Sequence, residues 1–257
     1  PWNADLDGAW YYYPNNDNNA CFPSCWSMSN GGAASYNWRN TTTASNIRTG
    51  SYAIYYYGSS SSSVEHDDWL ITPELQLTGN ERLVFWMRNS SSTTTAGTYD
   101  ARVAIYALTS NSTDFVQISP RITMVGGQAT YTEHIVPLTG LTGNVKLAFV
   151  VDTNSYSFYI DDVTVEPIPS CPKPRFVTVD SVSRTSVSLS WKNNATEFIV
   201  DYKKSADTVW STMTGIYDTT VTVINLLPSS TYQFRVKAVC MVGDSSVWSE
   251  IAEGATE

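Results

Sequence analysis

The sequence lacks the features of a helical or membrane-spanning protein. None of its 257 residues belongs to an apolar run of eighteen or more, so no segment is expected to cross a membrane as a helix. No stretch of useful length shows the 3.6-residue apolar period of an amphipathic helix. The chain also begins without the basic region and apolar segment of a signal peptide, so we expect that any leader has been removed or lies outside this sequence. The pattern predicts an all-β protein.

Motifs of common enzyme classes are absent as well. There is no Gly-x-Ser-x-Gly elbow, no phosphate-binding loop and no His-Glu-x-x-His zinc motif. A Ser-His-Asp arrangement could be assembled from His66, Asp67 and one of many serines, but His66 lies in a polar loop beside acids and is interpreted as part of a solvated turn. Four glutamates sit singly and do not form the facing pair that glycoside hydrolysis needs: Glu65, Glu74, Glu81 and Glu133. We predict that the chain is not an enzyme.

Basic residues are scarce. The chain has 15 Lys and Arg against 24 Asp and Glu, which gives a formal charge of −9. Residues 1–169 hold 7 basic and 15 acidic residues, whereas residues 170–257 hold 8 and 9. Because nucleic-acid binding needs clustered Lys and Arg to neutralise phosphates, we expect no nucleic-acid partner. The acidic first part of the chain is better suited to metal cations.

Only four cysteines are present: Cys21, Cys25, Cys171 and Cys240. Their even number, the absence of Cys-x-x-Cys pairs and the abundance of Ser, Thr, Asn and Tyr indicate disulfides in an oxidising, extracytoplasmic setting. Cys21 and Cys25 would then tie a long surface excursion over residues 11–50. They could instead form half of a zinc site, but the two histidines of the chain do not have a finger-like spacing.

Residues 158–166, Phe-Tyr-Ile-Asp-Asp-Val-Thr-Val-Glu, read as a strand with two adjacent carboxylates in its middle. The apolar residues Ile160, Val163 and Val165 change parity at this acidic pair, which predicts a bulge because strand side chains alternate with a period of two. Asp161 and Asp162 could hydrogen-bond a nearby loop or hold a cation.

Residues 3–8, Asn-Ala-Asp-Leu-Asp-Gly, match the front half of a calcium-binding loop, in which oxygen ligands fall on alternate residues. Pro14 stands where an EF-hand would place its bidentate glutamate, so the remaining ligands must come from elsewhere in the fold. Asp161 and Asp162 are the natural donors, because the first and last strands of many jelly rolls lie together; Asp67 and Asp68 are a second possibility. The predicted calcium ligands are Asn3, Asp5, Asp7, Asp161 and Asp162.

Many short strands separated by Gly-, Asn- and Ser-rich turns predict an antiparallel jelly-roll β-sandwich over residues 1–169. Pro167 begins a stretch with four prolines in eight residues, which marks a stiff linker. The strands expected in this first domain lie at 51–57, 68–77, 82–88, 103–108, 130–138, 145–151 and 157–166.

Residues 170–257 form a second predicted domain, a seven-stranded sandwich. Its expected strands lie at 176–180, 186–191, 197–203, 209–213, 220–226, 232–239 and 247–252. Pro228 followed by Tyr232 has the pattern of a tyrosine corner, and with Trp191, Tyr202 and Trp248 this region resembles a fibronectin type III domain. In that topology the first strand starts at the end of the sandwich where the sixth strand stops, so Cys171 and Cys240 are predicted to form a disulfide.

The first domain resembles the cleaved-adhesin or choice-of-anchor J domains, which are relatives of MAM-type jelly rolls. The resemblance rests on the Asp-x-Asp-Gly of residues 5–8, on 67–75 (Asp-Asp-Trp-Leu-Ile-Thr-Pro-Glu-Leu), on 83–86 and on 159–163. It implies a calcium-stabilised jelly roll set beside fibronectin type III domains in adhesins and in non-catalytic regions of secreted proteins. Asp5, Asp7 and one of Asp161 or Asp162 match the family's cation site, and Asn3 replaces its usual first acid.

Several aromatic residues between positions 11 and 57 are candidates for ligand binding, because a flat ring can stack on a sugar: Trp26, Tyr36, Trp38 and the run Tyr55, Tyr56 and Tyr57. Alternatively, some cap the sandwich ends and the others decorate the surface. We predict a secreted or bacterial cell-surface adhesion module, a monomer within a larger multidomain chain, that binds an extracellular protein or glycan. The second hypothesis is a glycan-binding accessory region of a larger secreted hydrolase or protease.

Overall fold

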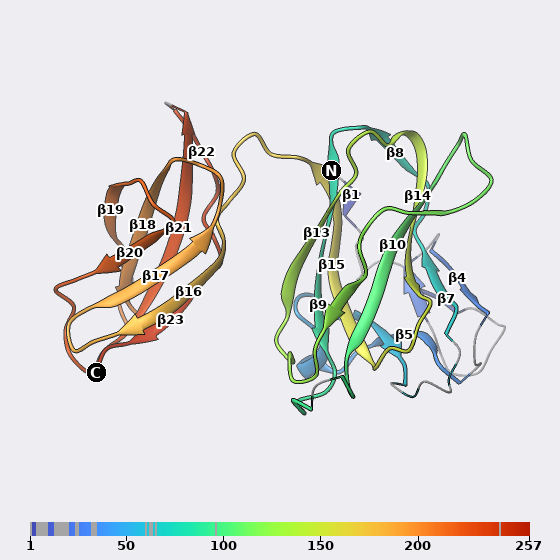
Figure 1. Cartoon of the computed structure of the whole chain (residues 1–257), viewed down its shortest axis with the longest axis horizontal. Helices are drawn as coiled ribbons and strands as arrows, with labels where there is room; N and C mark the ends of the chain where they lie inside the picture. The colour runs from blue at the N-terminus through green and yellow to red at the C-terminus, as the bar shows by residue number, and fades with distance from the viewer. Residues whose placement is uncertain are drawn as a thin grey trace. The chain divides into compact units, whose positions relative to one another are not determined.

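The computed structural model describes residues 2–3, 10–12, 21–23, 26–31, 35–59, 61, 64, 66–95, 97–241 and 243–257. These residues form antiparallel β-sheets and one single-turn 3-10 helix, η1 (Ala44–Asn46). No helix in this part of the chain is long and apolar enough to cross a membrane. The chain divides into two compact units, residues 1–168 and 169–257 (Figure 1), and each is described by itself.

The first unit contains a six-stranded sheet in the order β13-β9-β15-β6-β5, with β1 also paired to β15. Its strands are β13 (Thr132–Pro137), β9 (Glu81–Asn89), β15 (Phe158–Pro167), β6 (Ala53–Tyr57), β5 (Asn37–Thr41) and β1 (Trp2–Asn3). Strand β15, the last of the unit, therefore lies in the interior of the sheet, between β9 on one side and β6 and β1 on the other.

A second, seven-stranded sheet has the order β11-β10-β14-β7-β4, with β12 paired to β10 and β8 to β14. Its strands are β11 (Val116–Gln117), β10 (Ala101–Thr109), β14 (Thr142–Val151), β7 (Asp68–Ile71), β4 (Ser27–Asn30), β12 (Ile122–Met124) and β8 (Leu75–Thr78). A separate hairpin joins β2 (Trp10–Tyr12) to β3 (Cys21–Pro23).

Side chains from both sheets fill one hydrophobic core. Phe85 and Phe158 come from the six-stranded sheet and Leu70 and Phe149 from the seven-stranded sheet, and all four are fully buried. Phe85 and Phe149 meet edge to face, with their ring centroids 5.1 Å apart. A sandwich of this kind leaves the other face of each sheet to carry polar and aromatic residues.

The predicted bulge in residues 158–166 is confirmed. The pairing of β15 with β9 shifts register between Asp161 and Thr164, and Asp162 has a φ of 48°, in the left-handed region. The expected meeting of the first and last strands is also present, because Trp2 pairs with Val165 and Asn3 with Thr164.

The second unit is a sandwich of a three-stranded sheet, β16-β17-β20, and a five-stranded sheet, β19-β18-β21-β22 with β23 also paired to β21. The strands are β16 (Arg175–Val182), β17 (Val187–Lys192), β18 (Glu197–Lys204), β19 (Ser211–Ile216), β20 (Thr220–Val223), β21 (Thr231–Met241), β22 (Asp244–Ser245) and β23 (Ala252–Ala255). The predicted tyrosine corner is present, because the hydroxyl of Tyr232 accepts a hydrogen bond of 3.0 Å from the Leu227 N–H.

The strand predicted at 247–252 is wrong, because β23 starts only at Ala252. Before it, the hydroxyls of Ser246 and Ser249 accept hydrogen bonds of 2.9 Å from the N–H groups of Ala238 and Val236 on β21. Side-chain oxygens therefore satisfy backbone donors that a regular ladder would have used.

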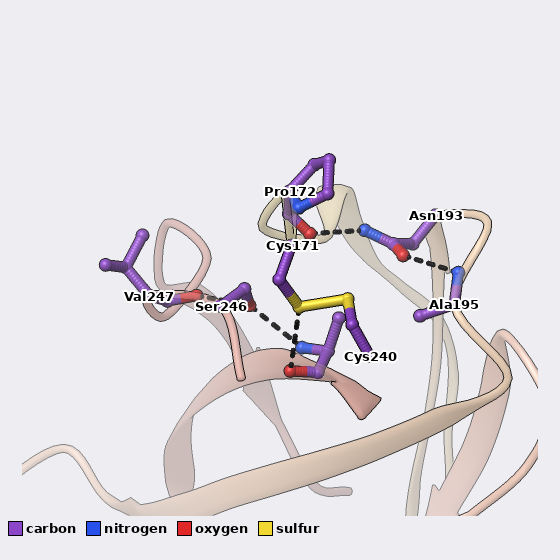
Figure 2. The surroundings of a disulfide bond; sticks show 8 residues. Cys171, Pro172, Asn193, Ala195, Cys240, Ser246 and Val247 are labelled. Atoms are coloured by element: carbon purple, nitrogen blue, oxygen red, sulfur yellow. Dashed lines mark hydrogen bonds between the residues drawn. A yellow bond between two sulfur atoms is a disulfide. The ribbon is translucent and has the colours of Figure 1, made fainter. Parts of the chain in front are cut away.

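The predicted disulfide joins Cys171 to Cys240, with the Cα atoms 5.7 Å apart and a sequence separation of 69 (Figure 2). Cys171 precedes β16, and Cys240 lies near the end of β21. Because the bridge closes a long loop, it removes chain entropy from the unfolded state.

We expect the double variant Cys171→Ala/Cys240→Ala to lower the free energy of unfolding of the second unit by about 4 kcal/mol, from the loop-closure entropy. Urea unfolding followed by hydrogen exchange of peptides from each unit measures the change, and the first unit serves as the internal control. A reducing agent should bring the unmodified chain to the stability of the variant. Equal stability of the variant and the unmodified chain would contradict the expectation.

Candidate ligand-binding face and cation site

The outward face of the six-stranded sheet carries a row of tyrosine and arginine side chains. Arg39 on β5 pairs with Tyr55 on β6, Tyr55 pairs with Tyr159 on β15, and Tyr159 pairs with Arg88 on β9. Residues directly opposite one another on adjacent strands share a face of the sheet. These four side chains therefore cross four neighbouring strands in one line.

The side chains of this row stack on one another. The rings of Tyr55 and Tyr159 lie 4.8 Å apart at 21°, and the Arg88 guanidinium lies 4.4 Å from the Tyr159 centroid. The Arg39 guanidinium lies 4.4 Å from the centroid of Tyr57. Tyr57 in turn stacks on Tyr36 at 5.6 Å. We call this set the outer row: Tyr36, Arg39, Tyr55, Tyr57, Arg88 and Tyr159.

Hydrogen bonds fix both arginines of the outer row. Arg39 donates to the Asn37 Oδ1 at 2.9 Å and to the Ser35 carbonyl at 3.2 Å. Arg88 donates to the Asn46 Oδ1 at 2.6 Å and to the Ala129 carbonyl at 3.2 Å. Side chains that are already ordered lose little conformational entropy when a partner binds, so the row is preorganised for recognition.

Two tyrosines of the outer row, Tyr55 and Tyr159, remain neutral. Burial raises the pKa of both Tyr55 and Tyr159 above the ordinary value for a phenol. Each hydroxyl can therefore donate a hydrogen bond as well as accept one at physiological pH.

Three of the six candidate ligand-binding aromatics, Trp26, Trp38 and Tyr56, belong to the core, which corrects the prediction for them. Trp26 is 3% exposed and stacks on Phe149, whereas Trp38 is 1% exposed and packs edge-on against Phe158. The strand parity of β5 turns Trp38 inward and Arg39 outward. The other three candidates, Tyr36, Tyr55 and Tyr57, lie in the outer row, where Tyr36 is half-buried against Tyr57.

The two adjacent acids of β15 bind the loop that follows η1. Asp161 accepts hydrogen bonds from the N–H groups of Arg48 at 2.7 Å and Asp162 at 2.8 Å. The Asp162 carboxylate pairs with the Arg48 guanidinium and the Thr49 hydroxyl. Of the two roles predicted for Asp161 and Asp162, hydrogen bonding to a nearby loop is therefore the one that the contacts of the described residues show.

Keeping the Asp161 carboxylate charged nevertheless costs free energy, because the group is buried. It is 1% exposed, and burial raises its pKa to about 6, although the hydrogen bonds from the Arg48 and Asp162 N–H groups oppose this rise. The Arg48 guanidinium is itself held 3.6 Å from the centroid of Trp86, the β9 partner of Asp161. A cation beside Asp161 would offset the cost of burying its charge.

Strand β1 runs antiparallel to β15, with Asn3 opposite Thr164, so its direction at Asn3 is toward Asp162. The other two predicted calcium ligands of this segment, Asp5 and Asp7, lie outside the described residues, as does Cys25. Within the described ranges, no group of three or more His, Cys, Asp or Glu residues could hold a metal ion.

His66 is buried, which corrects its interpretation as part of a solvated turn. It is 6% exposed, and its Nδ1 lies 2.6 Å from the hydroxyl of Tyr56, which donates to the Asp68 Oδ2 at 2.6 Å. The other ring nitrogen lies 3.1 Å from the Ser59 carbonyl oxygen. The hydrogen-bond partners shown for His66 do not include a serine hydroxyl, so the described residues form no catalytic triad around it.

Asp67 and Asp68, the second pair of acids considered as cation ligands, make different contacts. Asp67 accepts a hydrogen bond of 2.6 Å from the indole of Trp69. Asp68 is 1% exposed, and its Oδ1 has no hydrogen-bond partner among the described residues. Burial, with the neighbouring Asp68 carboxylate, raises the pKa of Tyr56, which keeps this hydroxyl protonated as a donor to Asp68.

We expect Tyr56→Phe to lower the free energy of unfolding of the first unit by about 1–3 kcal/mol, because it removes a buried donor from Asp68. Tyr57→Phe is the matched control: Tyr57 neighbours Tyr56 on β6 but is 39% exposed, and its change should stay within about 0.5 kcal/mol. Urea unfolding followed by hydrogen exchange in the first unit measures both. Equal effects of the two variants would show that the buried hydroxyl has no special role.

Comparisons with known proteins agree with this architecture. Residues 13–165 match the model of the Cleaved Adhesin Domain, and residues 172–255 match that of the Fibronectin type III domain. Such domains are binding and structural modules typical of extracellular or surface proteins.

Among solved structures, the K1 cleaved adhesin domain of Lys-gingipain from Porphyromonas gingivalis W83 is 19% identical, with a TM-score of 0.45 over 58% of this chain and 94% of that one. The K3 domain of the same protein is also 19% identical, with a TM-score of 0.41 over 56% of this chain and 92% of that one.

A curated relative is the receptor-type tyrosine-protein phosphatase F of Danio rerio, which is 34% identical over 86 residues, or 32% of this chain. The match spans only 4% of the length of that phosphatase. The adhesin match, in contrast, extends over more than half of the present chain. The protein therefore belongs to the cleaved adhesin domain family and carries a fibronectin type III domain after its family domain.

Proposed function

We propose that this chain is a non-catalytic binding module of a secreted or cell-surface protein and that it binds an extracellular protein or glycan through the outer row. The observation that carries the proposal is the line of Arg39, Tyr55, Tyr159 and Arg88 across four strands. Tyrosine and arginine are enriched at protein interfaces and at binding hot spots. Their presence on a sheet face that the core does not use supports a role in recognition.

A glycan-binding accessory role within a larger secreted hydrolase or protease is the second candidate. Aromatic rings and guanidinium groups in one line suit an extended sugar chain, because rings pack on its C–H faces and guanidinium groups donate to its hydroxyls. The two candidates share the surface and differ in the ligand, so a binding screen separates them.

We expect Tyr57→Ala and Tyr159→Ala to reduce ligand binding at least tenfold, because each removes a ring from the outer row. A glycan array and a panel of immobilised extracellular matrix proteins provide the probes. Hits on the array alone favour the accessory role, and hits on the proteins alone favour adhesion. Tyr217→Ala is the control, because Tyr217 is 74% exposed and lies in the second unit. Binding that survives both outer-row changes, or that Tyr217→Ala weakens equally, would contradict the proposal.

We also propose that calcium stabilises the first unit, held by residues of the segment that begins at Asn3, including Asp5 and Asp7, together with Asp161 or Asp162. Two observations support this site: β1 is directed toward Asp162, and Asp161 is a buried carboxylate whose charge a cation would offset. Carboxylate and amide oxygens are the donors that calcium prefers. The ion would join the first strand to the last.

A cation that binds only the folded state must stabilise it, so the melting temperature of the first unit should be several degrees higher in millimolar calcium than in chelator. The double change Asp5→Asn/Asp7→Asn should abolish this difference, whereas Asp17→Asn, a control in the same N-terminal segment, should preserve it. Calorimetry of the full chain measures the shift. Melting curves that coincide with and without calcium would exclude the site.

A further inference from the structure

The second unit contains a cavity of about 570 Å³ beside the disulfide. One wall comes from residues 170–176 and the other from residues 192–196, with Cys240 at the side. Figure 2 shows Cys171 and Pro172 facing Asn193 and Ala195 across this region. The Asn193 side chain links the two walls, because it donates to the Pro172 carbonyl at 2.8 Å and accepts from the Ala195 N–H at 2.8 Å.

The walls of this cavity are tied by covalent and hydrogen bonds. The disulfide fixes Cys171 to Cys240, and the Cys171 sulfur also lies 3.7 Å from the Ala238 carbonyl oxygen. Ligand sites are usually preformed cavities of a few hundred to a thousand cubic ångströms, and this cavity falls within that range. Its size suits a small ligand better than a broad protein surface.

The cavity is basic in a chain that is strongly acidic. Three cationic side chains line it, Lys173, Arg175 and Lys192, and its lining contains no aspartate or glutamate. The Lys173 ammonium lies 3.2 Å from a carboxylate oxygen of Glu250, which is outside the lining and has a side chain that is 62% exposed. A concave surface lined by one sign of charge concentrates counter-ions of the other sign, so the cavity favours an anion.

Phe176 stands exposed among these cations in an uncommon backbone conformation. Its φ is 54°, in the left-handed region that bulky residues seldom adopt, and the pairing of β16 with β17 shifts register between Arg175 and Thr178. Phe176 is 55% exposed, with the Arg175 guanidinium 5.0 Å and the Lys192 ammonium 5.7 Å from its ring centroid. Strained residues of this kind cluster at ligand sites.

We propose that this cavity binds an acidic saccharide, a sugar that carries a carboxylate or sulfate group. The cations Arg175 and Lys192 would pair with the anionic group, while the exposed part of the Phe176 ring packs against the C–H face of the sugar. A small inorganic anion would use the charges but leave the ring without a role. An acidic peptide would satisfy the charges, but a compact cavity beside a single ring fits a sugar residue better.

This site uses residues of the second unit alone, so it is independent of the outer row and of the calcium site. The two binding proposals can therefore fail separately. Changes to the cavity that abolish acidic-saccharide binding should leave ligand binding by the outer row of the first unit unchanged. Conversely, the Tyr159→Ala variant should retain acidic-saccharide binding.

The test is calorimetric titration of the full chain with four probes: a sulfated heparin hexasaccharide, a hyaluronan hexasaccharide as the carboxylated sugar, a neutral maltohexaose and a hexaglutamate peptide. We expect binding of at least one acidic saccharide, weakening as salt increases, with no binding of maltohexaose. The two acidic sugars distinguish sulfate from carboxylate recognition. Absence of binding to both would overturn the proposal, as would tighter binding of hexaglutamate.

Variants then locate the site. Lys192→Gln changes an exposed residue and should weaken binding several-fold, and Arg175→Gln/Lys192→Gln should weaken it at least tenfold. Arg184→Gln/Lys204→Gln makes the same change in net charge outside the cavity and should alter binding less than twofold. Equal losses in the two double variants would show that net charge alone attracts the sugar and would overturn the proposal.

A change at Phe176 tests the role of the ring. Phe176→Asn keeps a residue that tolerates the left-handed conformation and removes the apolar face. It should weaken acidic-saccharide binding at least fivefold while leaving the melting temperature of the second unit unchanged or higher. Unchanged saccharide binding would contradict the recognition of a sugar ring, and the melting temperature of each variant confirms that it is folded.

Discussion

The first unit depends on the pairing of strand β15 within the six-stranded sheet. This strand is the last in the unit, yet it pairs with β9 along one edge and with β6 and β1 along the other. The backbone N–H and C=O groups of three other strands are therefore satisfied only when β15 is in place. Contacts between segments so distant in sequence carry a large loop-closure cost before they contribute stability.

The bulge in β15 allows one strand to serve two purposes. Before the bulge, Tyr159 points outward into the outer row while Phe158 and Ile160 fill the core. At the bulge, the Asp161 carboxylate accepts hydrogen bonds from the N–H groups of Arg48 and Thr49. These bonds hold the loop that follows η1. The helical turn η1, just before this loop, ends at Asn46, whose side-chain oxygen accepts a hydrogen bond from Arg88 of the outer row. The binding face and the acidic pair are thus parts of one connected structure.

Local patterns in the sequence predicted the features whose causes are local. The parity change at residues 160–163 predicted the bulge, and the spacing of Pro228 and Tyr232 predicted the tyrosine corner, because each depends on a few neighbouring residues. The disulfide followed once the second sandwich was recognised, since its topology brings Cys171 close to Cys240.

Features that depend on strand register and on burial could not be predicted from the sequence alone. Trp38 and Arg39 are adjacent, and only the position of the core shows that the tryptophan points inward and the arginine outward. The outer row requires knowledge of which residue lies opposite which on four strands. The burial of His66 involves packing of its ring against Tyr36 and Tyr56, which its polar sequence neighbours do not indicate. The aspartate at 161 was identified, but its partners in the loop at residues 48–49 lie more than a hundred residues away.

The position of the disulfide has a mechanical consequence for a domain in a chain under tension. A pulling force that reaches the second unit through the proline-rich linker meets Cys171 first and passes through the sulfur–sulfur bond to Cys240. The intervening chain, with a separation of 69 residues, is thereby shielded from the force. At about 3.5 Å per residue, roughly 240 Å of extended length cannot be drawn out while the bond is intact. Reduction of this one bond would make the enclosed segment available for extension.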